Sequence, residues 1–232
     1  MYSKDFKKLS LSQLRNKWGS VIIAMLIAIL VVYAISLITQ IPNTVSIFIQ
    51  NHTHGIISAI TGIIAAVATL VLLAAQVLVS GCISYGVGNY QLHFVRHGET
   101  NISYIFSGFS YGGNVIKRSF ILFLLTEIFV FLWSLLLIIP GIIAALSYSQ
   151  AFYILIDDDN ISASEALKLS KKMMKGYKGR LFCLGLSFIG WILLCCLTFG
   201  IGFIFLAPYI GTAYANFYEY LRGIYENSKN VY

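Results

Sequence analysis

Long apolar segments constrain this chain more than any other feature. The first runs for about 23 residues, from Gly19 to Ile41, and matches the ~20 residues that cross a ~30 Å hydrocarbon core as an α-helix. Of the 232 residues, 58% are hydrophobic and only 11% are charged, against about 25% charged in soluble domains. A water-facing surface cannot cover so many apolar side chains. The sequence therefore predicts an all-α membrane protein.

We predict one integral membrane domain, residues 1–232, built as a six-helix polytopic bundle. Its expected spans are 19–41, 56–79, 117–139, 141–156, 181–198 and 201–218. Residues 1–18 are a basic N-terminal segment, 157–180 an amphipathic segment and 219–232 a tail. Pro42 to Gly55 is predicted to be a short polar connection, and the second span is expected to continue as helix towards Tyr90.

Two helical hairpins are predicted in the second half of the chain. Residues 119–156 would be about 57 Å long as one straight helix, so they must fold back, and Pro140 with Gly141 marks the turn. Gly200 and Gly202 mark the turn of the second hairpin. Both hairpins open with basic residues and carry a tryptophan, which favours an internal repeat. Because their turns are almost wholly apolar, the hairpins either span the membrane or are re-entrant.

The distribution of basic residues predicts the topology. Three connections are expected on one side, Pro42 to Gly55 and the two hairpin turns. They contain no Lys or Arg, so all 16 basic residues fall on the other side. By the positive-inside rule, both termini are cytoplasmic. The same rule explains the net charge of +7, and no nucleic-acid-binding motif accompanies it. Nucleic acid is therefore not an expected partner.

Glu127 lies ten residues after Lys117, close to the middle of its predicted span. An acidic side chain at this depth costs about 3 kcal/mol and usually faces the interior of a bundle. We expect a hydrogen bond to a neutral partner such as Gln76 or Gln150. This intramembrane polar site has two interpretations, a polar contact between helices or a position on an ion or proton path.

Ser162 and Glu165 have the spacing of a capping box, which predicts the start of a helix. Apolar residues follow at helical intervals, and the lysines lie mostly on the other side, at Lys168, Lys171, Lys172, Lys175 and Lys178. The segment is predicted to be an amphipathic helix at the membrane interface, whose lysines contact anionic lipid headgroups. Generic anchoring and specific recognition of a lipid or protein partner both fit this pattern.

Small residues in the last span form a ladder that allows close helix packing, within the bundle or between protomers: Ala207, Gly211 and Ala215. His93 and His97 are four residues apart without a third metal ligand in register. Three consecutive aspartates, 157–159, do not converge on an ion by themselves. We therefore expect no metal site and no cofactor. No motif of a known catalytic class is present, so no catalytic residue is assigned.

The second half of the chain also carries a family resemblance. Its matching features are Pro140 with Gly141, the acidic Asp157, the helix from Glu165 to Gly176, Pro208 with Tyr209, and the aromatic pair Phe217 and Tyr218. These resemble the domain of unknown function 975 family of bacterial integral membrane proteins, which implies the bacterial cytoplasmic membrane. The same turn and helix have a distant likeness to the membrane domain of glycerophosphodiester phosphodiesterases, but the sequence contains no phosphodiesterase catalytic domain. The resemblance implies an architecture and supplies no activity.

The sequence thus predicts a non-enzymatic polytopic membrane protein, an accessory or organising component of the bacterial cytoplasmic membrane. Its expected partners are anionic lipid headgroups on the cytoplasmic side and either a membrane protein or a second copy of the chain. One alternative is a small transporter or channel with Glu127 in its path. A weaker alternative is an intramembrane enzyme acting on lipid.

Overall fold

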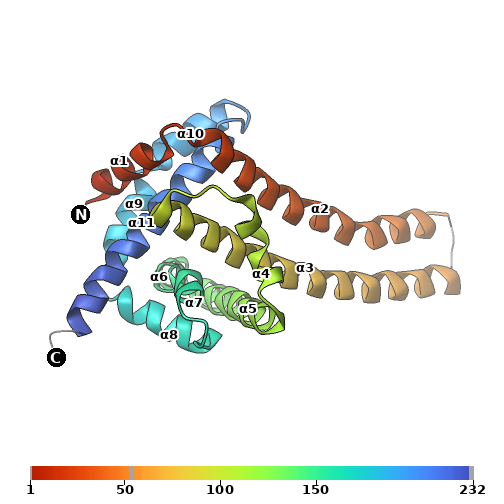
Figure 1. Ribbon diagram of the computed structural model, residues 1–232. Helices are drawn as coiled ribbons and strands as arrows, with labels where there is room; N and C mark the ends of the chain where they lie inside the picture. Colours follow the sequence, from red (N-terminus) through yellow and green to blue (C-terminus); the bar gives the residue numbers. More distant parts are fainter. Residues whose placement is uncertain (1, 53–54, 230–232) are drawn as a thin grey trace.

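The computed structural model describes residues 2–52 and 55–229, which fold almost entirely as helix, with no strand among them. Figure 1 shows a long helical hairpin that extends away from a cluster of shorter helices. The elements, in chain order, are α1 (Ser3–Leu14), α2 (Trp18–Gln50), α3 (Ile56–His97), the 3-10 helix η1 (Ile102–Phe106), α4 (Ser107–Ser110), α5 (Gly113–Leu136), α6 (Ile138–Tyr148), α7 (Ala151–Asp157), α8 (Ala163–Met173), α9 (Lys178–Leu186), α10 (Ile189–Leu197) and α11 (Phe203–Lys229).

Five segments of the described chain are long and apolar enough to cross a membrane. They are α2, α3, α5, the stretch Ile138–Asp157 that holds α6 and α7, and the stretch Lys178–Leu197 that holds α9 and α10. The structure therefore has the helix lengths and the apolar composition of a helical membrane protein. The sixth expected span, 201–218, lies in α11, which is not one of these five segments. The count of six crossings stays a prediction.

The α2–α3 hairpin is longer than the sequence predicted. α2 has 33 residues and α3 has 42, about 50 Å and 63 Å of helix, well beyond a ~30 Å hydrocarbon core. The predicted connection from Pro42 to Gly55 is wrong, because α2 continues through Pro42 to Gln50. Pro42 removes one backbone hydrogen bond, whereas ending the helix in lipid would leave several groups unpaired. α3 includes the expected continuation to Tyr90 and ends at His97, capped by Gly98, whose φ of 70° is left-handed.

The first predicted hairpin is formed by α5 and α6, and its turn lies earlier than expected. The chain is extended at Leu137 (φ −162°, ψ 148°), between the end of α5 and the start of α6. Pro140 lies in the first turn of α6, where the backbone N–H groups have no helical partner and a proline is tolerated. The expected turn at Pro140 and Gly141 is therefore wrong. Gly141 serves the packing instead, because a side chain there would collide with Ser134 on α5.

The second hairpin turns at the expected place, between α10 and α11. Phe199 (φ 52°) and Gly200 (φ 88°) are left-handed, which reverses the chain direction. Gly202 then packs against Cys195 on α10, so closely that a Cβ at Gly202 would lie 2.6 Å from the Cys195 sulfur. The first arm of this hairpin is not one continuous helix, because α9 ends at Leu186 and α10 begins at Ile189.

Both hairpins contain the same close contact. Gly202 follows Gly141 by 61 residues, and Cys195 follows Ser134 by the same number. In each hairpin a glycine therefore packs against the residue seven positions before it, on the other arm. This match supports the internal repeat that the sequence favoured.

The basic residues that open the two hairpins bond to the ends of the arms that return. Arg118 of α5 donates hydrogen bonds to the backbone carbonyl oxygens of Asp158 (2.6 Å) and Asp159 (2.5 Å), just after α7. Arg180 of α9 donates to the hydroxyl oxygen of Tyr220 on α11 (2.8 Å). We call the part of the molecule that carries these contacts the basic end.

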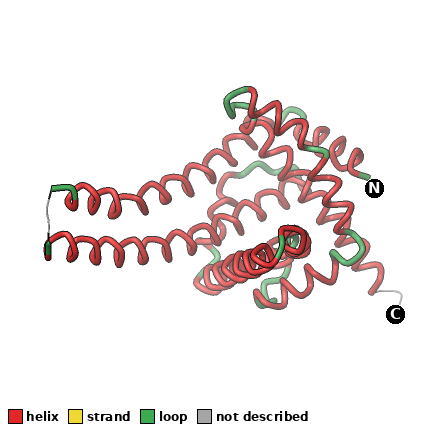
Figure 2. Tube along the Cα trace, turned by 180° about the vertical axis from the view of Figure 1, so that it is seen from behind, coloured by secondary structure: helices red, strands yellow, loops and turns green. Residues whose placement is uncertain are grey.

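α1 is a packed helix, whereas the sequence indicated only a basic segment there. Phe6, Ser10 and Leu14 recur every four residues and are buried, and α1 contacts α9 and α11. The centroid of the Phe6 ring lies 5.3 Å from that of Phe217, and the Asn216 amide donates a hydrogen bond to the Ser10 hydroxyl (3.2 Å). The N-terminal helix is thus held against the C-terminal one, as Figure 2 shows from behind.

α8 begins at the predicted capping box. The Ser162 backbone N–H donates to the Glu165 carboxylate (2.9 Å), and the Glu165 N–H donates to the Ser162 hydroxyl (3.3 Å). The hydrogen bonds from Ser162 lower the pKa of the Glu165 carboxyl group.

The apolar face of α8 is covered by the protein, which corrects the prediction that it rests on the membrane interface. α8 contacts α5, α6, α7 and α11, and the Ser170 hydroxyl donates to the backbone oxygen of Ser147 on α6 (2.8 Å). The buried residues of α8 are Ala163, Ala166, Leu167, Ser170 and Met173.

The small residues of α11 pack within the chain. A Cβ on Gly211 would collide with the Gln91 amide of α3, and Met25 of α2 lies 3.6 Å from the same position. Ala215 is fully buried, and Ala207 lies beside a groove described below. The close packing predicted for this ladder therefore occurs between helices of one chain.

Gly141→Ala tests the hairpin contact. The added methyl group would lie 2.9 Å from the Cα atom of Ser134, so a backbone must move. We expect a loss of about 1–3 kcal/mol in the free energy of unfolding, the usual cost of overpacking, seen as a lower thermal midpoint in detergent. Gly190→Ala is the control, because nothing lies within 4 Å of its Cβ position. Equal midpoints for both variants would contradict the contact.

Candidate functional site

An ion-pair network joins three helices at the basic end. Arg96, near the end of α3, donates from Nη1 and Nη2 to the two carboxylate oxygens of Asp157, at the end of α7, both at 2.8 Å. Its Nε donates to the Glu219 carboxylate of α11, also at 2.8 Å. A bidentate guanidinium–carboxylate pair is stronger and more directional than a single charged hydrogen bond. Arg96 therefore fixes the relative positions of α3, α7 and α11.

Asp157 is the most connected acid of this network. Tyr218 donates its hydroxyl proton to the carboxylate (2.8 Å), and Arg222 approaches the same oxygen at 3.2 Å. The Asp157 side chain is only 15% exposed and that of Arg96 25%. Arg222 also donates to Glu226 (2.8 Å), and this carboxylate raises the pKa of the Arg222 guanidinium. The network holds the carboxylates paired where water screens them poorly.

A polar pocket of about 590 Å³ lies next to this network, between α3, α5 and the end of α7. Asn89, His93 and Arg96 line it from α3, and Arg118 and Asp159 line it from the other side. The His93 ring stacks on Tyr104 at 4.1 Å, and Tyr104 donates to the Glu99 carboxylate (2.8 Å), which raises the pKa of that phenol.

The lining of the pocket offers hydrogen-bonding groups of both charges. Arg118 and Arg96 supply guanidinium groups, Asp157 and Asp159 supply carboxylates, and Asn89 donates to Ser107 (3.0 Å). Such a set can hold a polar or zwitterionic group by hydrogen bonds. The pocket lining contains no serine, cysteine or lysine that a neighbouring base could activate.

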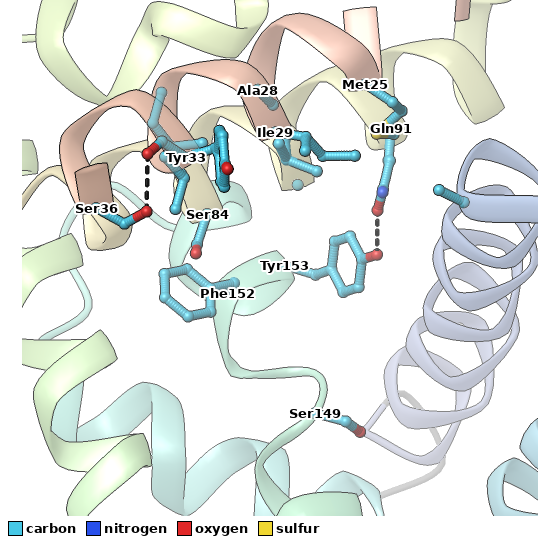
Figure 3. A pocket seen from close by; sticks show the side chains of 15 residues that line it. Met25, Ala28, Ile29, Tyr33, Ser36, Ser84, Gln91, Ser149, Phe152 and Tyr153 are labelled. Atoms are coloured by element: carbon cyan, nitrogen blue, oxygen red, sulfur yellow. Dashed lines mark hydrogen bonds between the residues drawn. The ribbon is translucent and has the colours of Figure 1, made fainter. Parts of the chain in front are cut away.

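A larger groove of about 710 Å³ lies between α2, α3, α7 and α11, within the apolar part of the chain (Figure 3). Figure 3 shows the hydrogen bond from the Tyr153 hydroxyl to Gln91 (2.5 Å) on one side of the groove. Most other lining side chains are apolar, such as Ile29 and Phe152. A groove of this kind at hydrocarbon depth accommodates an acyl chain more readily than a charged solute.

The structure does not bring Glu127, Gln76 and Gln150 together. Glu127 is exposed on α5, whose buried residues lie on another face. Gln76 accepts a hydrogen bond from the Thr39 hydroxyl (3.1 Å), which links α3 to α2. Gln150 is fully buried and donates to Ser149 (2.9 Å). The predicted intramembrane polar site is therefore three separate groups.

The lysines of α8 and the segment after it point away from the protein core. Lys168, Lys171, Lys172 and Lys175 are exposed, and Lys178, the first residue of α9, is half-buried. The Lys172 ammonium lies 5.6 Å from the centroid of the Tyr225 ring of α11. The first four lysines, which we call the α8 lysine row, are therefore displayed on α8 and, for Lys175, on the turn that follows it.

Asp157→Asn tests the network. Removing one charge leaves Arg96 and Arg222 without their shared carboxylate, so we expect a loss of about 1–3 kcal/mol in the free energy of unfolding, less than for a fully buried pair because the groups are partly exposed. The measurement is the thermal midpoint in detergent. Asp158→Asn is the matched control, because within residues 2–52 and 55–229 that carboxylate accepts only from the Asn160 backbone N–H (2.9 Å). If the network does not stabilise the fold, the two variants will have equal thermal midpoints.

Comparison with known proteins gives a family and no activity. No curated protein and no solved structure matches the chain significantly. One family model matches residues 1–148 and 135–224, and its description is "Protein of unknown function (DUF975)". The two stretches extend over nearly the whole chain, and they confirm the resemblance expected from the sequence. The chain belongs to this family of proteins of unknown function.

Proposed function

We propose that this protein is a non-enzymatic accessory or organising component of the bacterial cytoplasmic membrane, whose cytoplasmic face binds anionic lipid headgroups or a membrane-protein partner. The observation that carries the proposal is the α8 lysine row, held outward on and just after a helix whose apolar face packs against its own bundle. The lysines need no further apolar contact to keep their position. They are a permanent cationic surface.

The charge of the lysine row is available to a ligand. None of its four lysines forms an ion pair with a carboxylate in the described part of the chain. The Ser170 to Ser147 hydrogen bond and the capping box at Ser162 fix both the rotation and the start of α8. A basic group near an anionic leaflet gains about 1 kcal/mol, and such contributions add when the groups share one surface.

The arrangement of the helices is consistent with both termini on one side of the membrane. α1 packs against α11, and the Phe6 ring lies 5.3 Å from Phe217 and 5.6 Å from Tyr220. Lys17 donates to the backbone oxygen of Gly98 (2.6 Å), beside the Arg96 network. The positive-inside rule would orient this end towards the cytoplasm.

No specific observation supports either alternative function, a transporter or channel or an intramembrane enzyme. Glu127 lines neither the 710 Å³ groove nor the 590 Å³ polar pocket, so neither cavity provides a transport path through it. The polar pocket holds carboxylates already bonded to arginines, without an adjacent nucleophile. Binding is the activity that these groups support best.

The lysine row can be tested by neutralisation. We expect the variant with Lys168, Lys171, Lys172 and Lys175 all changed to Gln to lose at least tenfold of its co-purifying anionic lipid or partner protein, because about 1 kcal/mol is lost per lysine. The measurement is mass spectrometry of protein purified from native membranes in mild detergent. The control changes four exposed lysines elsewhere, Lys4, Lys8, Lys117 and Lys229. Equal losses in both variants would reject α8 as the contact surface.

The topology has its own test. A reporter that is active only in the cytoplasm, fused after Tyr232, should be active, and a reporter active only outside should not. Fusions after Asn51, at the turn of the α2–α3 hairpin, should give the opposite pair of results. Activity outside for the fusion at Tyr232 would overturn the cytoplasmic placement of the C-terminus.

A further inference from the structure

A second polar pocket, of about 480 Å³, adjoins the 590 Å³ polar pocket described above. The two pockets share three lining residues, Asn114, Arg118 and Asp159. The second pocket lies between the start of α5 and the start of α8, and its other lining residues include Lys117 and Ser164. We call it the α5–α8 pocket. The shared residues place the two pockets side by side.

The polar pocket contains hydrogen-bond acceptors without a partner. Tyr85 is 2% exposed, yet its hydroxyl group forms no hydrogen bond with residues 2–52 or 55–229. Asn89 is 3% exposed and donates from its amide nitrogen to Ser107 (3.0 Å), which leaves its carbonyl oxygen unused by that part of the chain. The Asp159 carboxylate likewise has no hydrogen bond or ion pair among the described residues. Because buried polar groups are normally hydrogen-bonded, this wall of the pocket favours a ligand that donates.

The same pocket offers little to an anion. The three guanidinium nitrogens of Arg96 donate to carboxylates, and the two terminal nitrogens of Arg118 donate to backbone oxygens just after α7. The groups that remain free in the buried wall can all accept a hydrogen bond, and Asp159 adds a negative charge beside them. Such a set favours an ammonium group, which donates three hydrogen bonds and accepts none.

The α5–α8 pocket has the opposite character. The Lys117 ammonium group and the Arg118 guanidinium group have no carboxylate partner among the described residues. Ala163 and Ser164 are the first two residues of α8, so their backbone N–H groups lack a helical partner and lie at the positive end of the helix dipole. The Glu165 carboxylate, which caps this helix, lines neither pocket. These groups favour a phosphate.

We propose that the two pockets together bind a phosphoethanolamine group, with its phosphate in the α5–α8 pocket and its ammonium group in the polar pocket. Two carbon atoms join these charges, so the group needs a cationic and an anionic region side by side. Arg118 and Asp159 supply both regions where the pockets meet. The three donors of the ammonium group match the acceptors of Asp159, Asn89 and Tyr85. A quaternary ammonium group has no N–H, so phosphocholine would leave these acceptors unpaired.

The position of the site favours a lipid as the source of this group. Lys117 and Arg118 lie near the beginning of α5, and Asp159 lies two residues after the apolar stretch Ile138–Asp157. The pockets are therefore at the boundary of the apolar segments, which is the level of lipid headgroups. Soluble phosphoethanolamine is the other source. The proposal goes beyond the α8 lysine row, whose residues line neither pocket.

Lipid titrations followed by native mass spectrometry test the site. The full-length protein in detergent is titrated with phosphatidylethanolamine, phosphatidylcholine or phosphatidylglycerol of identical acyl chains, and separately with soluble phosphoethanolamine. We expect phosphatidylethanolamine to bind about fivefold more tightly than phosphatidylcholine, because only its ammonium group donates hydrogen bonds. Equal binding of these two lipids would overturn the proposal. Tighter binding of soluble phosphoethanolamine than of the lipid would support the site and assign it to a soluble ligand.

Neutralising Asp159 tests the ammonium end. Asp159→Asn keeps the backbone oxygen that Arg118 contacts and removes the charge, so we expect it to weaken phosphatidylethanolamine binding about tenfold. Asp158→Asn is the matched control, because Asp158 lines neither pocket. Phosphatidylglycerol, which reports on the lysine row, should bind equally well to both variants. Equal affinity of the two variants for phosphatidylethanolamine would overturn the proposal.

Tyr85→Phe separates binding from folding. The substitution removes only a hydroxyl group that has no partner in the described chain, so the thermal midpoint in detergent should not fall. Phosphatidylethanolamine should nevertheless bind about threefold more weakly, because one acceptor of the ammonium group is lost. Unchanged affinity for this lipid would contradict the assignment of the polar pocket to the ammonium group.

Discussion

The exclusion of water from the hydrocarbon core is the constraint on which the rest of this structure depends. An unpaired backbone N–H or C=O group costs several kcal/mol there, so the apolar segments remain helical even where the sequence carries a helix breaker. α2 passes through Pro42, and Pro140 lies in the first turn of α6 instead of ending a helix. The glycines that pack between the arms, Gly141 and Gly202, then allow the hairpins to close tightly.

Features decided by neighbouring residues could be predicted from the sequence, whereas those decided by the rotation of a helix could not. Apolar length predicted the long helices, and the cap at Ser162 lies at its expected position. The exposure of Glu127 was not predictable, because hydropathy gives the depth of a residue and not the face on which it lies. The turn before Pro140 was misplaced for a local reason, since a proline is tolerated in the first turn of a helix and therefore does not mark the end of the preceding one.

Amphipathic periodicity likewise indicates an apolar face without saying what covers it. The face of α8 was assigned to the membrane interface, yet it packs against α5, α6, α7 and α11. α1 shows the same ambiguity, because Phe6 and Ser10 at helical spacing are buried against the last helix. The Arg96–Asp157 pair joins residues 61 positions apart, and with 16 basic and nine acidic residues many other pairings were equally compatible with the sequence.

The charged groups now fall into two kinds. Those of the Arg96 network satisfy one another and position three helices, so their contribution is internal. The α8 lysine row and Glu127 point outward, but they differ in environment. Each lysine lies where a charge is well solvated, so its attraction to an anionic surface is small and only the sum matters. Glu127 lies where one unpaired group costs about 3 kcal/mol, so a single residue can decide which helix packs beside α5. Attraction of the lysine row to an anionic surface is therefore additive, whereas the cost of an unpaired carboxyl group falls on one side chain.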